Sequence, residues 1–301
     1  RINEAMPVTP TAVVTTILLA AQGVGLTSEQ IGRGIQDVLD YCHRMGVPQA
    51  ASLASLNKVS GVEATLKSLA SGDGPVTRVD GARDVVWLIE TKDELRATFY
   101  RNSLVHVILL SAICEIALVL AAQRSPAGPE RIDTFWQSVD RLRDLLKFEF
   151  YFKEKAVYRQ RIEAEMDRTG ADWRERLQAA EVDISGLLRD RRPVSAPYAL
   201  APFFEAYEIV ADVLAHQEIA GPIDRAAVKK EALALGDQWL AQHRISSAEP
   251  VSALLFETAL QLADNQGVLA EGDDRAERAK AFRAELHNIH GAIDVIDGVA
   301  R

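Results

Sequence analysis

Two histidines and a carboxylate near the end of the chain have the types and spacing of a metal site. His287, His290 and Asp294 follow one another at intervals of three and four residues, which places them on one face of a helix. Imidazole and carboxylate groups arranged in this way could hold a divalent cation, as in a metal-dependent hydrolase. A solvated polar helix face explains the same pattern without a ligand. We adopt that interpretation and predict no metal site and no cofactor.

A second group combines aromatic and basic side chains. The sequence places four aromatic residues within five positions, with three lysines beside them: Phe148, Phe150, Tyr151, Phe152, Lys147, Lys153 and Lys155. Aromatic rings bury large areas, so we expect most of this run to pack in the core. Rings that face outward beside lysines would suit an anionic lipid surface or another domain. Contact with a membrane or with a further domain is therefore the alternative.

A third group, Tyr100-Arg101-Asn102, stands before a long apolar segment. The guanidinium of an arginine can clamp a phosphate with two parallel hydrogen bonds. A buried Arg101 that pairs with Glu94 or with helix C-terminal carbonyls is the alternative. We adopt the buried arginine as our interpretation.

The familiar catalytic motifs are missing from this sequence. It contains no glycine-rich phosphate loop, no Gly-x-Ser-x-Gly elbow, no HExxH and no paired CxxC. None of the six histidines is followed five residues later by aspartate, so a His-x4-Asp acyl-transfer pair is absent. That pair needs both residues, because the histidine takes a hydroxyl proton while the aspartate orients it. We therefore predict no catalytic residue in this chain.

Composition excludes some classes of protein. The 301 residues carry a net charge of -9, which disfavours nucleic acid as a partner because phosphate contacts are made by Lys and Arg. The two cysteines, Cys42 and Cys114, are too few for a disulfide framework, and we expect reduced thiols. The chain opens at Arg1 with neither an initiator Met nor a signal peptide. We expect it to be part of a longer protein.

The elements that would position these groups are mainly helices. Capping signals at Thr9-Pro10, at Thr27 with Gln30, and at Thr91 with Glu94 each predict a helix start. Turn and strand signals predict a β-hairpin over 76–89, so residues 27–90 resemble a winged-helix-like element. The remaining pattern predicts helices over the following ranges: 10–21, 27–45, 60–70, 93–124, 132–166, 171–188, 203–216, 224–240, 251–263 and 275–299.

Some details of this mainly α fold stay open. The segment 104–122 is long and apolar enough to span a bilayer, but Glu115 near its middle favours a buried core helix. A break at 101–103 is an alternative to one continuous helix. A second winged-helix-like unit over 224–268 is a further alternative, and we expect the charged tail to fray. We divide the chain into helical subdomains at 1–124 and 125–301.

Three blocks of sequence resemble a known family: RINEAMPVTPTAVVTTILLA at 1–20, FYRNSLVHVILLSAI at 99–113 and LLKFEFYF at 145–152. In their order and approximate spacing they resemble the C-terminal half of bacterial membrane-associated glycerol-3-phosphate 1-O-acyltransferases. The segment DRRPVSAPYALAPFFEAYEIVADVL at 190–214 is similar to the actinobacterial branch. The resemblance covers about residues 1–270. One departure is Ser103, which replaces the second asparagine of a Tyr-Arg-Asn-Asn tetrad.

The resemblance implies a function for the longer protein. Such an enzyme transfers a fatty acyl group from acyl-CoA or acyl carrier protein to the 1-hydroxyl of sn-glycerol 3-phosphate, at the cytoplasmic face of the cell membrane. The His-x4-Asp and glycerol phosphate motifs of the family lie upstream of the part that matches Arg1, so no catalytic residue carries over. The resemblance therefore implies a helical, peripheral scaffold whose partners are the acyltransferase domain and the membrane surface, and which is inactive alone.

A binding module of the winged-helix type is the alternative function. Its recognition helix would be residues 60–70, where Lys67 is the one base, with Lys58 just before the helix. So few basic residues are a poor basis for DNA binding. We rank this hypothesis second.

Overall fold

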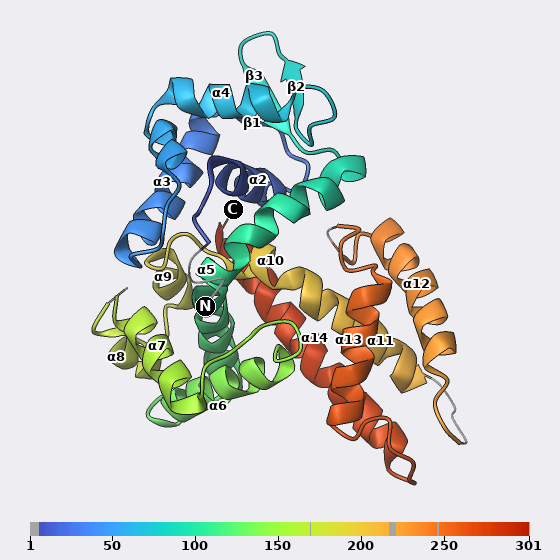
Figure 1. The fold of residues 1–301 in the computed structure, drawn as a ribbon. Helices are drawn as coiled ribbons and strands as arrows, with labels where there is room; N and C mark the ends of the chain where they lie inside the picture. Colours follow the sequence, from blue (N-terminus) through green and yellow to red (C-terminus); the bar gives the residue numbers. More distant parts are fainter. Residues whose placement is uncertain (1–5, 169, 217–220, 246, 301) are drawn as a thin grey trace. The chain divides into compact units, whose positions relative to one another are not determined.

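The computed structural model describes residues 6–168, 170–216, 221–245 and 247–300. The opening residues 1–5 of the first family-like block, including the start at Arg1, lie outside the described residues. The chain is mainly helical with one small antiparallel sheet, as predicted (Figure 1). It divides into two compact units, one of Arg1–Leu109 with Ser247–Glu249 and the other of Leu110–Ser246 with Pro250–Arg301. The division predicted after residue 124 stays a prediction.

The first unit contains the sheet. Its elements in chain order are α2 (Pro10–Ala20), β1 (Leu26–Thr27), α3 (Ser28–Arg44), η1 (Ala51–Asn57), α4 (Val59–Leu69), β2 (Thr77–Asp80), β3 (Val85–Leu88), η2 (Thr91–Asp93) and the beginning of α5 (Glu94–Arg124). Two predicted caps are present, because Thr9 accepts from the Ala12 amide at the start of α2 and Thr27 forms a capping box with Gln30 at the start of α3.

The sheet has the strand order β1-β3-β2. Strands β2 and β3 form the predicted hairpin, and the sequence of helices followed by this hairpin agrees with the winged-helix-like element expected at 27–90. Strand β1 was not predicted, because its two residues give too short a pattern and Thr27 also caps a helix. Trp87 of β3 is buried and donates to the Ser28 hydroxyl at 3.2 Å, which joins the sheet to α3.

Helix α5 is continuous over 31 residues, so the break considered at 101–103 does not occur. The Ser103 hydroxyl bonds back to the Tyr100 carbonyl at 2.7 Å, which satisfies this polar residue inside the helix. The capping box predicted at Thr91 is wrong, because η2 precedes α5 there and has no side-chain cap. The helix is long and apolar enough to cross a membrane, yet 89% of its most apolar window is buried inside the protein. This burial agrees with the predicted core helix.

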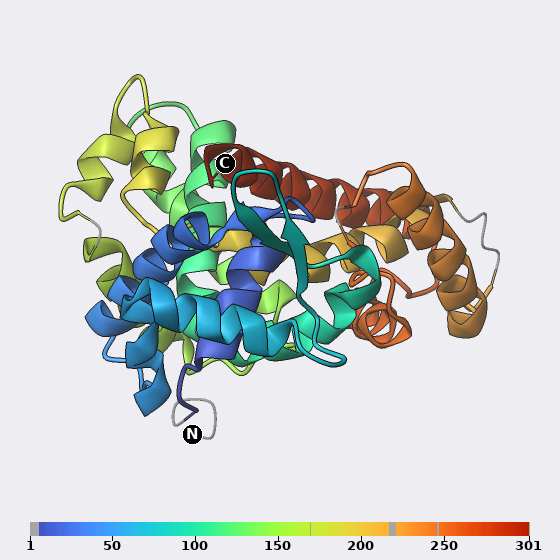
Figure 2. The same cartoon turned by 90° about the horizontal axis from the view of Figure 1, so that it is seen from above.

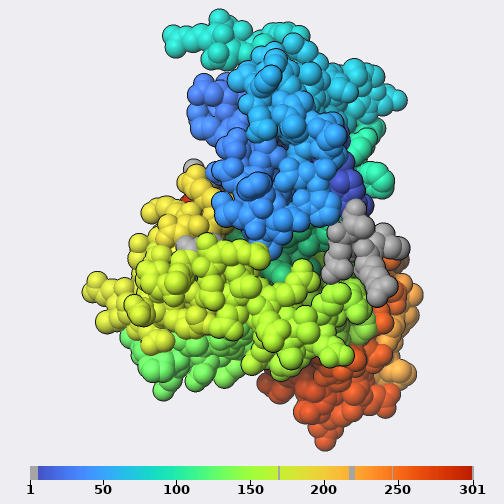
Figure 3. Space-filling view, turned by 60° about the vertical axis from the view of Figure 1, so that its left-hand side comes forward, coloured from blue at the N-terminus to red at the C-terminus, as the bar shows by residue number. Residues whose placement is uncertain are grey.

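The secondary-structure elements among the described residues of the second unit are all helices. It contains the end of α5 and then α6 (Glu130–Leu145), α7 (Lys155–Asp167), α8 (Trp173–Gln178), α9 (Ile184–Arg189), α10 (Ala196–Ala199), α11 (Ala201–His216), α12 (Arg225–Ala241), α13 (Ala253–Asn265) and α14 (Arg275–Ala300). In the space-filling view of Figure 3, the yellow-green segment that includes α7 and α8 forms part of its outer surface.

Four predictions for this unit are wrong. The helix expected over 132–166 is two helices separated at 146–154, because the aromatic run packs its rings on different neighbours. The helix expected over 171–188 is likewise two, and Asp183 caps the second. The described residues of 224–268 form no strand, so there is no second winged-helix-like unit. The tail does not fray, since α14 runs beside α11 and buries a row of apolar side chains (Figures 1 and 2).

Candidate functional site

The start of α5 holds Arg101 in a buried ion pair. Arg101 donates to Glu249 with both terminal nitrogens, from Nη1 to Oε2 at 2.9 Å and from Nη2 to Oε1 at 2.5 Å. The two side chains are 3% and 13% exposed. Thr98 adds a hydroxyl donor to Glu249 at 3.3 Å, and Asn102 accepts from Arg101 at 2.6 Å. The buried arginine is confirmed, but its partner is Glu249.

The partner expected for Arg101, Glu94, lies on the same face of α5 and is also buried. Burial raises the pKa of Glu94, a backbone hydrogen bond from Ala248 opposes this, and the nearby Glu249 adds to it. Residues 94, 98 and 101 are each about one turn apart, so all three side chains contact the segment that carries Ala248 and Glu249. Because its guanidinium is committed to a carboxylate, Arg101 is not placed here to clamp a phosphate.

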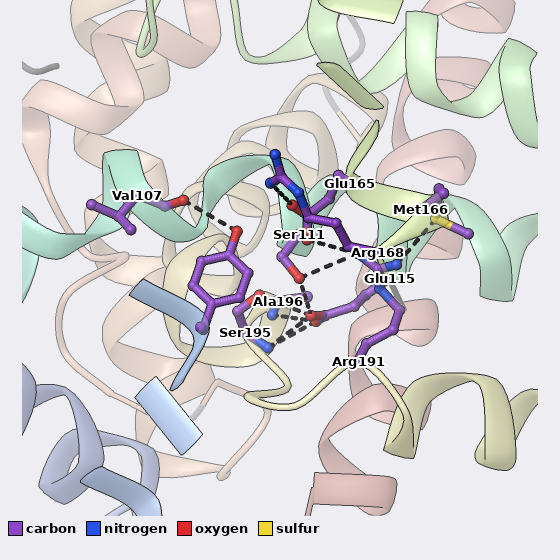
Figure 4. Close-up of polar contacts among 10 residues, drawn as sticks. Val107, Ser111, Glu115, Glu165, Met166, Arg168, Arg191, Ser195 and Ala196 are labelled. Carbon is purple, nitrogen blue, oxygen red and sulfur yellow. Dashed lines mark hydrogen bonds and ion pairs between the residues drawn. The ribbon is translucent and has the colours of Figure 1, made fainter. Parts of the chain in front are cut away.

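A buried carboxylate stands in the apolar part of α5. Figure 4 shows Glu115 facing the start of α10, where it accepts from the Ser195 amide at 2.8 Å, the Ala196 amide at 2.7 Å and the Ser195 hydroxyl at 2.8 Å. The Ser111 hydroxyl adds a donor at 3.1 Å. Burial raises the pKa of Glu115, and the charge of Arg191 and these hydrogen bonds oppose the rise. The carboxylate therefore satisfies free amides at a helix start.

Arg191 lies in the same network. Its side chain is 1% exposed and pairs with Glu165 at 3.2 Å. It also donates to the Met166 sulfur at 3.2 Å and lies 3.4 Å from the Ser111 hydroxyl (Figure 4). The sequence signal that was missed is that Glu115, an unexplained charge in an apolar helix, needed a buried cation nearby.

The histidine cluster joins α14 to α11 and does not form the metal set considered from the sequence. Glu208 of α11 accepts from Nδ1 of His287 at 2.8 Å and from Nδ1 of His290 at 2.5 Å. Nε2 of His290 lies 3.7 Å from Glu205 and 3.8 Å from Asp294. Among the described residues there is no group able to hold a metal ion. The buried Glu208, which the sequence did not single out, is the centre of this cluster.

Charges in this cluster shift two pKa values. Burial alone would raise the pKa of Glu208, but hydrogen bonds and charge from His290 and His287 outweigh it, so that pKa is lowered. Burial alone would lower the pKa of His290, but Glu208, Glu205 and Asp294 raise it above the usual value. The cluster therefore favours a carboxylate beside an imidazolium.

The aromatic run is divided between core and surface. The ring of Phe150 packs edge to face on Phe203 at 5.1 Å, and that of Phe152 packs on Tyr158 at 5.4 Å. Tyr151 points outward and is 83% exposed. Two of the neighbouring lysines are engaged within the protein, Lys147 with Asn265 at 2.6 Å and Lys155 with Asp140 at 2.8 Å. Phe150 and Phe152 are thus half-buried against other rings, whereas Tyr151 is exposed.

The two cysteines are free and buried, in agreement with reduced thiols. Burial raises the pKa of Cys42 to about 11 and raises that of Cys114 further. Neither thiol is therefore activated as a nucleophile.

Residues 1–272 match the family described as the glycerol-3-phosphate acyltransferase C-terminal region. A Mycobacterium tuberculosis (strain ATCC 25618 / H37Rv) protein named "Putative acyltransferase plsB1" is 34% identical over 303 residues, which cover 100% of this chain and 48% of that protein. A Mycobacterium bovis protein of the same name matches equally. A glycerol-3-phosphate acyltransferase of Pseudoalteromonas atlantica is 22% identical, over 97% of this chain and 35% of its own length. The chain spans about half the length, or less, of these relatives.

Proposed function

We propose that this chain is the helical, non-reacting half of an enzyme that acylates sn-glycerol 3-phosphate. The reason is that the chain belongs to the glycerol-3-phosphate acyltransferase C-terminal family. The full enzyme would take a fatty acyl group from acyl-CoA or acyl carrier protein and attach it to the 1-hydroxyl. This reaction begins phospholipid synthesis. The observation that carries the proposal is the family match over residues 1–272.

The role proposed for this half is to support the acyltransferase half. The most apolar window of α5 is 89% buried, and the charge of Arg101 is matched by Glu249. Such an arrangement suits a rigid scaffold better than a site that binds a changing substrate. The sequence also lacks the His-x4-Asp pair that acyl transfer would use, which fits a supporting role.

Peripheral attachment to the cytoplasmic face of the membrane is a further part of the proposal. Tyr151 supports it, because an exposed tyrosine suits the boundary between water and lipid. The net charge of -9 and the engaged lysines mean that attraction to anionic lipid contributes little. Flotation of the full-length protein with phosphatidylcholine vesicles tests this part. Tyr151→Glu should reduce flotation, whereas Leu254→Glu, at a residue that is 75% exposed, should not. Equal flotation of both variants would argue against attachment through Tyr151.

The reaction itself is tested with the full-length protein that carries this chain. Purified protein should convert glycerol 3-phosphate and either acyl donor to 1-acyl-sn-glycerol 3-phosphate, identified by mass spectrometry with regioselective lipase digestion. Acylation of lysophosphatidate instead, or of no phosphorylated acceptor, would contradict the proposal.

A winged-helix-type regulatory module is the second candidate. The hairpin of β2 and β3, which follows α3 and α4 and pairs with β1, favours it. Its candidate recognition helix is weak for nucleic acid, because Lys67 lies 3.4 Å from Glu63 on the same helix. A salt-sensitive shift of duplex DNA by the protein would favour this candidate over the first.

A further inference from the structure

The first turns of α5 have one polar face and one apolar face. The polar face, Glu94, Thr98 and Arg101, is held against the segment that carries Glu249. About a third of a turn away around the helix, Leu95 is 60% exposed and Phe99 is 78% exposed. These two residues are one turn apart and therefore form a continuous apolar patch. We call Leu95, Phe99 and Tyr100 the α5 patch.

The orientation of the α5 patch is fixed by the polar contacts behind it. Rolling α5 to cover Phe99 would break the two hydrogen bonds that join Arg101 to Glu249 and leave both charges without their partners. The ring of Phe99 also meets that of Tyr100 edge to face at 5.8 Å, so the exposed rings are held together. The protein therefore maintains apolar and aromatic surface in water, which is unfavourable unless that surface is covered.

The charges around the α5 patch indicate what covers it. Lys92 pairs with Glu90 at 2.8 Å, and Arg96 lies 3.7 Å from Asp93. An anionic membrane would be attracted by unpaired basic residues beside the apolar side chains. A protein interface instead combines aromatic residues at its centre with a rim of paired polar groups. The rim also contains the exposed Asn102, whose side-chain oxygen accepts from Arg101.

We infer that the α5 patch is the surface on which the upstream acyltransferase half of the same enzyme docks. This inference rests on the proposed function. About half the length of the matching mycobacterial relatives lies outside the region that this chain covers, which supplies an occupant of the required size. Docking there buries Phe99 and Leu95 in a protein interface that exists with or without lipid.

Thiol labelling of the full-length protein tests the inference. Phe99→Cys places a thiol in the α5 patch, and Val59→Cys is the matched control, since Val59 is 62% exposed in the same unit at the start of α4. The native Cys42 and Cys114 are buried and give little background. In detergent solution without lipid, the thiol at position 99 should react with a maleimide about tenfold or more slowly than the thiol at position 59, because a thiol in an interface reacts only when the interface opens.

Fast labelling at position 99 with and without vesicles would overturn the inference, and protection that appears only with vesicles would assign the patch to lipid instead. Misfolding is visible as additional labels on Cys42 and Cys114, and in that case Leu95→Cys on the same face takes the place of Phe99→Cys. The acyl transfer assay of the wild-type protein stands apart. If the proposed function is wrong, that assay detects no acylation of glycerol 3-phosphate. Slow labelling at position 99 would even then show that the α5 patch is covered.

Discussion

At the scale of single residues, the energetics are dominated by charges that are buried and matched. Arg101 and Glu249 illustrate this, because their side chains are nearly inaccessible and share two hydrogen bonds. Removing one partner from such a pair leaves an uncompensated charge, which costs more than the pair itself contributes. The same holds for Glu115, whose donors include the backbone amides of Ser195 and Ala196 at the start of α10.

The first prediction concerns the Arg101–Glu249 pair. Arg101→Met should lower the free energy of unfolding by about 3–5 kcal/mol, because Glu249 is left buried without its cation. The double variant Arg101→Met/Glu249→Gln should be less destabilised than the sum of the two single variants. Urea unfolding of all four proteins measures the coupling. A strictly additive cycle would mean that the pair is not formed in solution.

The second prediction concerns Glu115. Leucine suits an apolar helix by its pattern, yet Glu115→Leu should destabilise the protein by about 2–6 kcal/mol, because it leaves two buried amides unsatisfied at about 1–3 kcal/mol each. Ser195→Ala removes one hydroxyl donor and leaves both amides paired, so it is the milder control. Thermal unfolding monitored by circular dichroism compares the two. Equal stability of Glu115→Leu and wild type would contradict the network.

At the scale of elements, the packing of α14 on α11 depends on protonation. The pKa of His290 is raised, so its contribution to stability is fully present below its usual value of 6.5 and is lost as the pH rises through the raised value. The pKa of Glu208 is lowered, so its contribution is present above its usual value of 4.5 and is lost as the pH falls through the lowered value. Both contributions are therefore present between pH 4.5 and pH 6.5, where the contact between the two helices is most stable.

The third prediction follows from these signs. The urea midpoint, followed by tryptophan fluorescence, should fall between pH 6 and pH 8.5 in the wild type and fall less in His290→Gln. His216→Gln is the control, because His216 is 65% exposed and its Nδ1 contacts Asp212, at 2.8 Å from the carbonyl oxygen and 3.4 Å from the carboxylate, rather than Glu208. Its pH dependence should equal that of the wild type. A fall of the same size in His290→Gln and in the wild type would rule out His290 as the source.

Local signals in the sequence were sufficient for the elements that begin with a cap or end with a turn. The Thr27–Gln30 capping box and the hairpin signals at 76–89 each depend on residues within a few positions of one another, and both features are present. Helix ends that depend on distant partners could not be predicted. The interruption at 146–154 follows from contacts of Phe150 with Phe203 and of Phe152 with Tyr158, which no local pattern reveals.

The same limit applies to the candidate site. Burial of Arg101 could be inferred from its place before an apolar helix, but its partner Glu249 is 148 positions away in the chain. The two histidines were found by their spacing, yet the carboxylate they share is on α11 rather than on their own helix. Partners on other elements require the fold.

At the scale of the whole molecule, family membership and the chemistry of the sequence lead to one account. The chain belongs to the C-terminal region family of glycerol-3-phosphate acyltransferases, and its sequence contains no His-x4-Asp pair. Its block FYRNS, at 99–103, supplies the arginine of a buried ion pair and two exposed aromatic rings. Our proposal is that this half supports a reaction that takes place on the other half.

The most direct measurement is a comparison of acyl transfer by the full-length protein and by this 301-residue chain alone, at equal molar concentration, with labelled glycerol 3-phosphate and palmitoyl-CoA. We predict labelled 1-acyl-sn-glycerol 3-phosphate from the full-length protein and none above the uncatalysed background from the chain alone, with circular dichroism confirming that the chain is helical. Turnover by the isolated chain would contradict the account, because it would require a catalytic group within these residues.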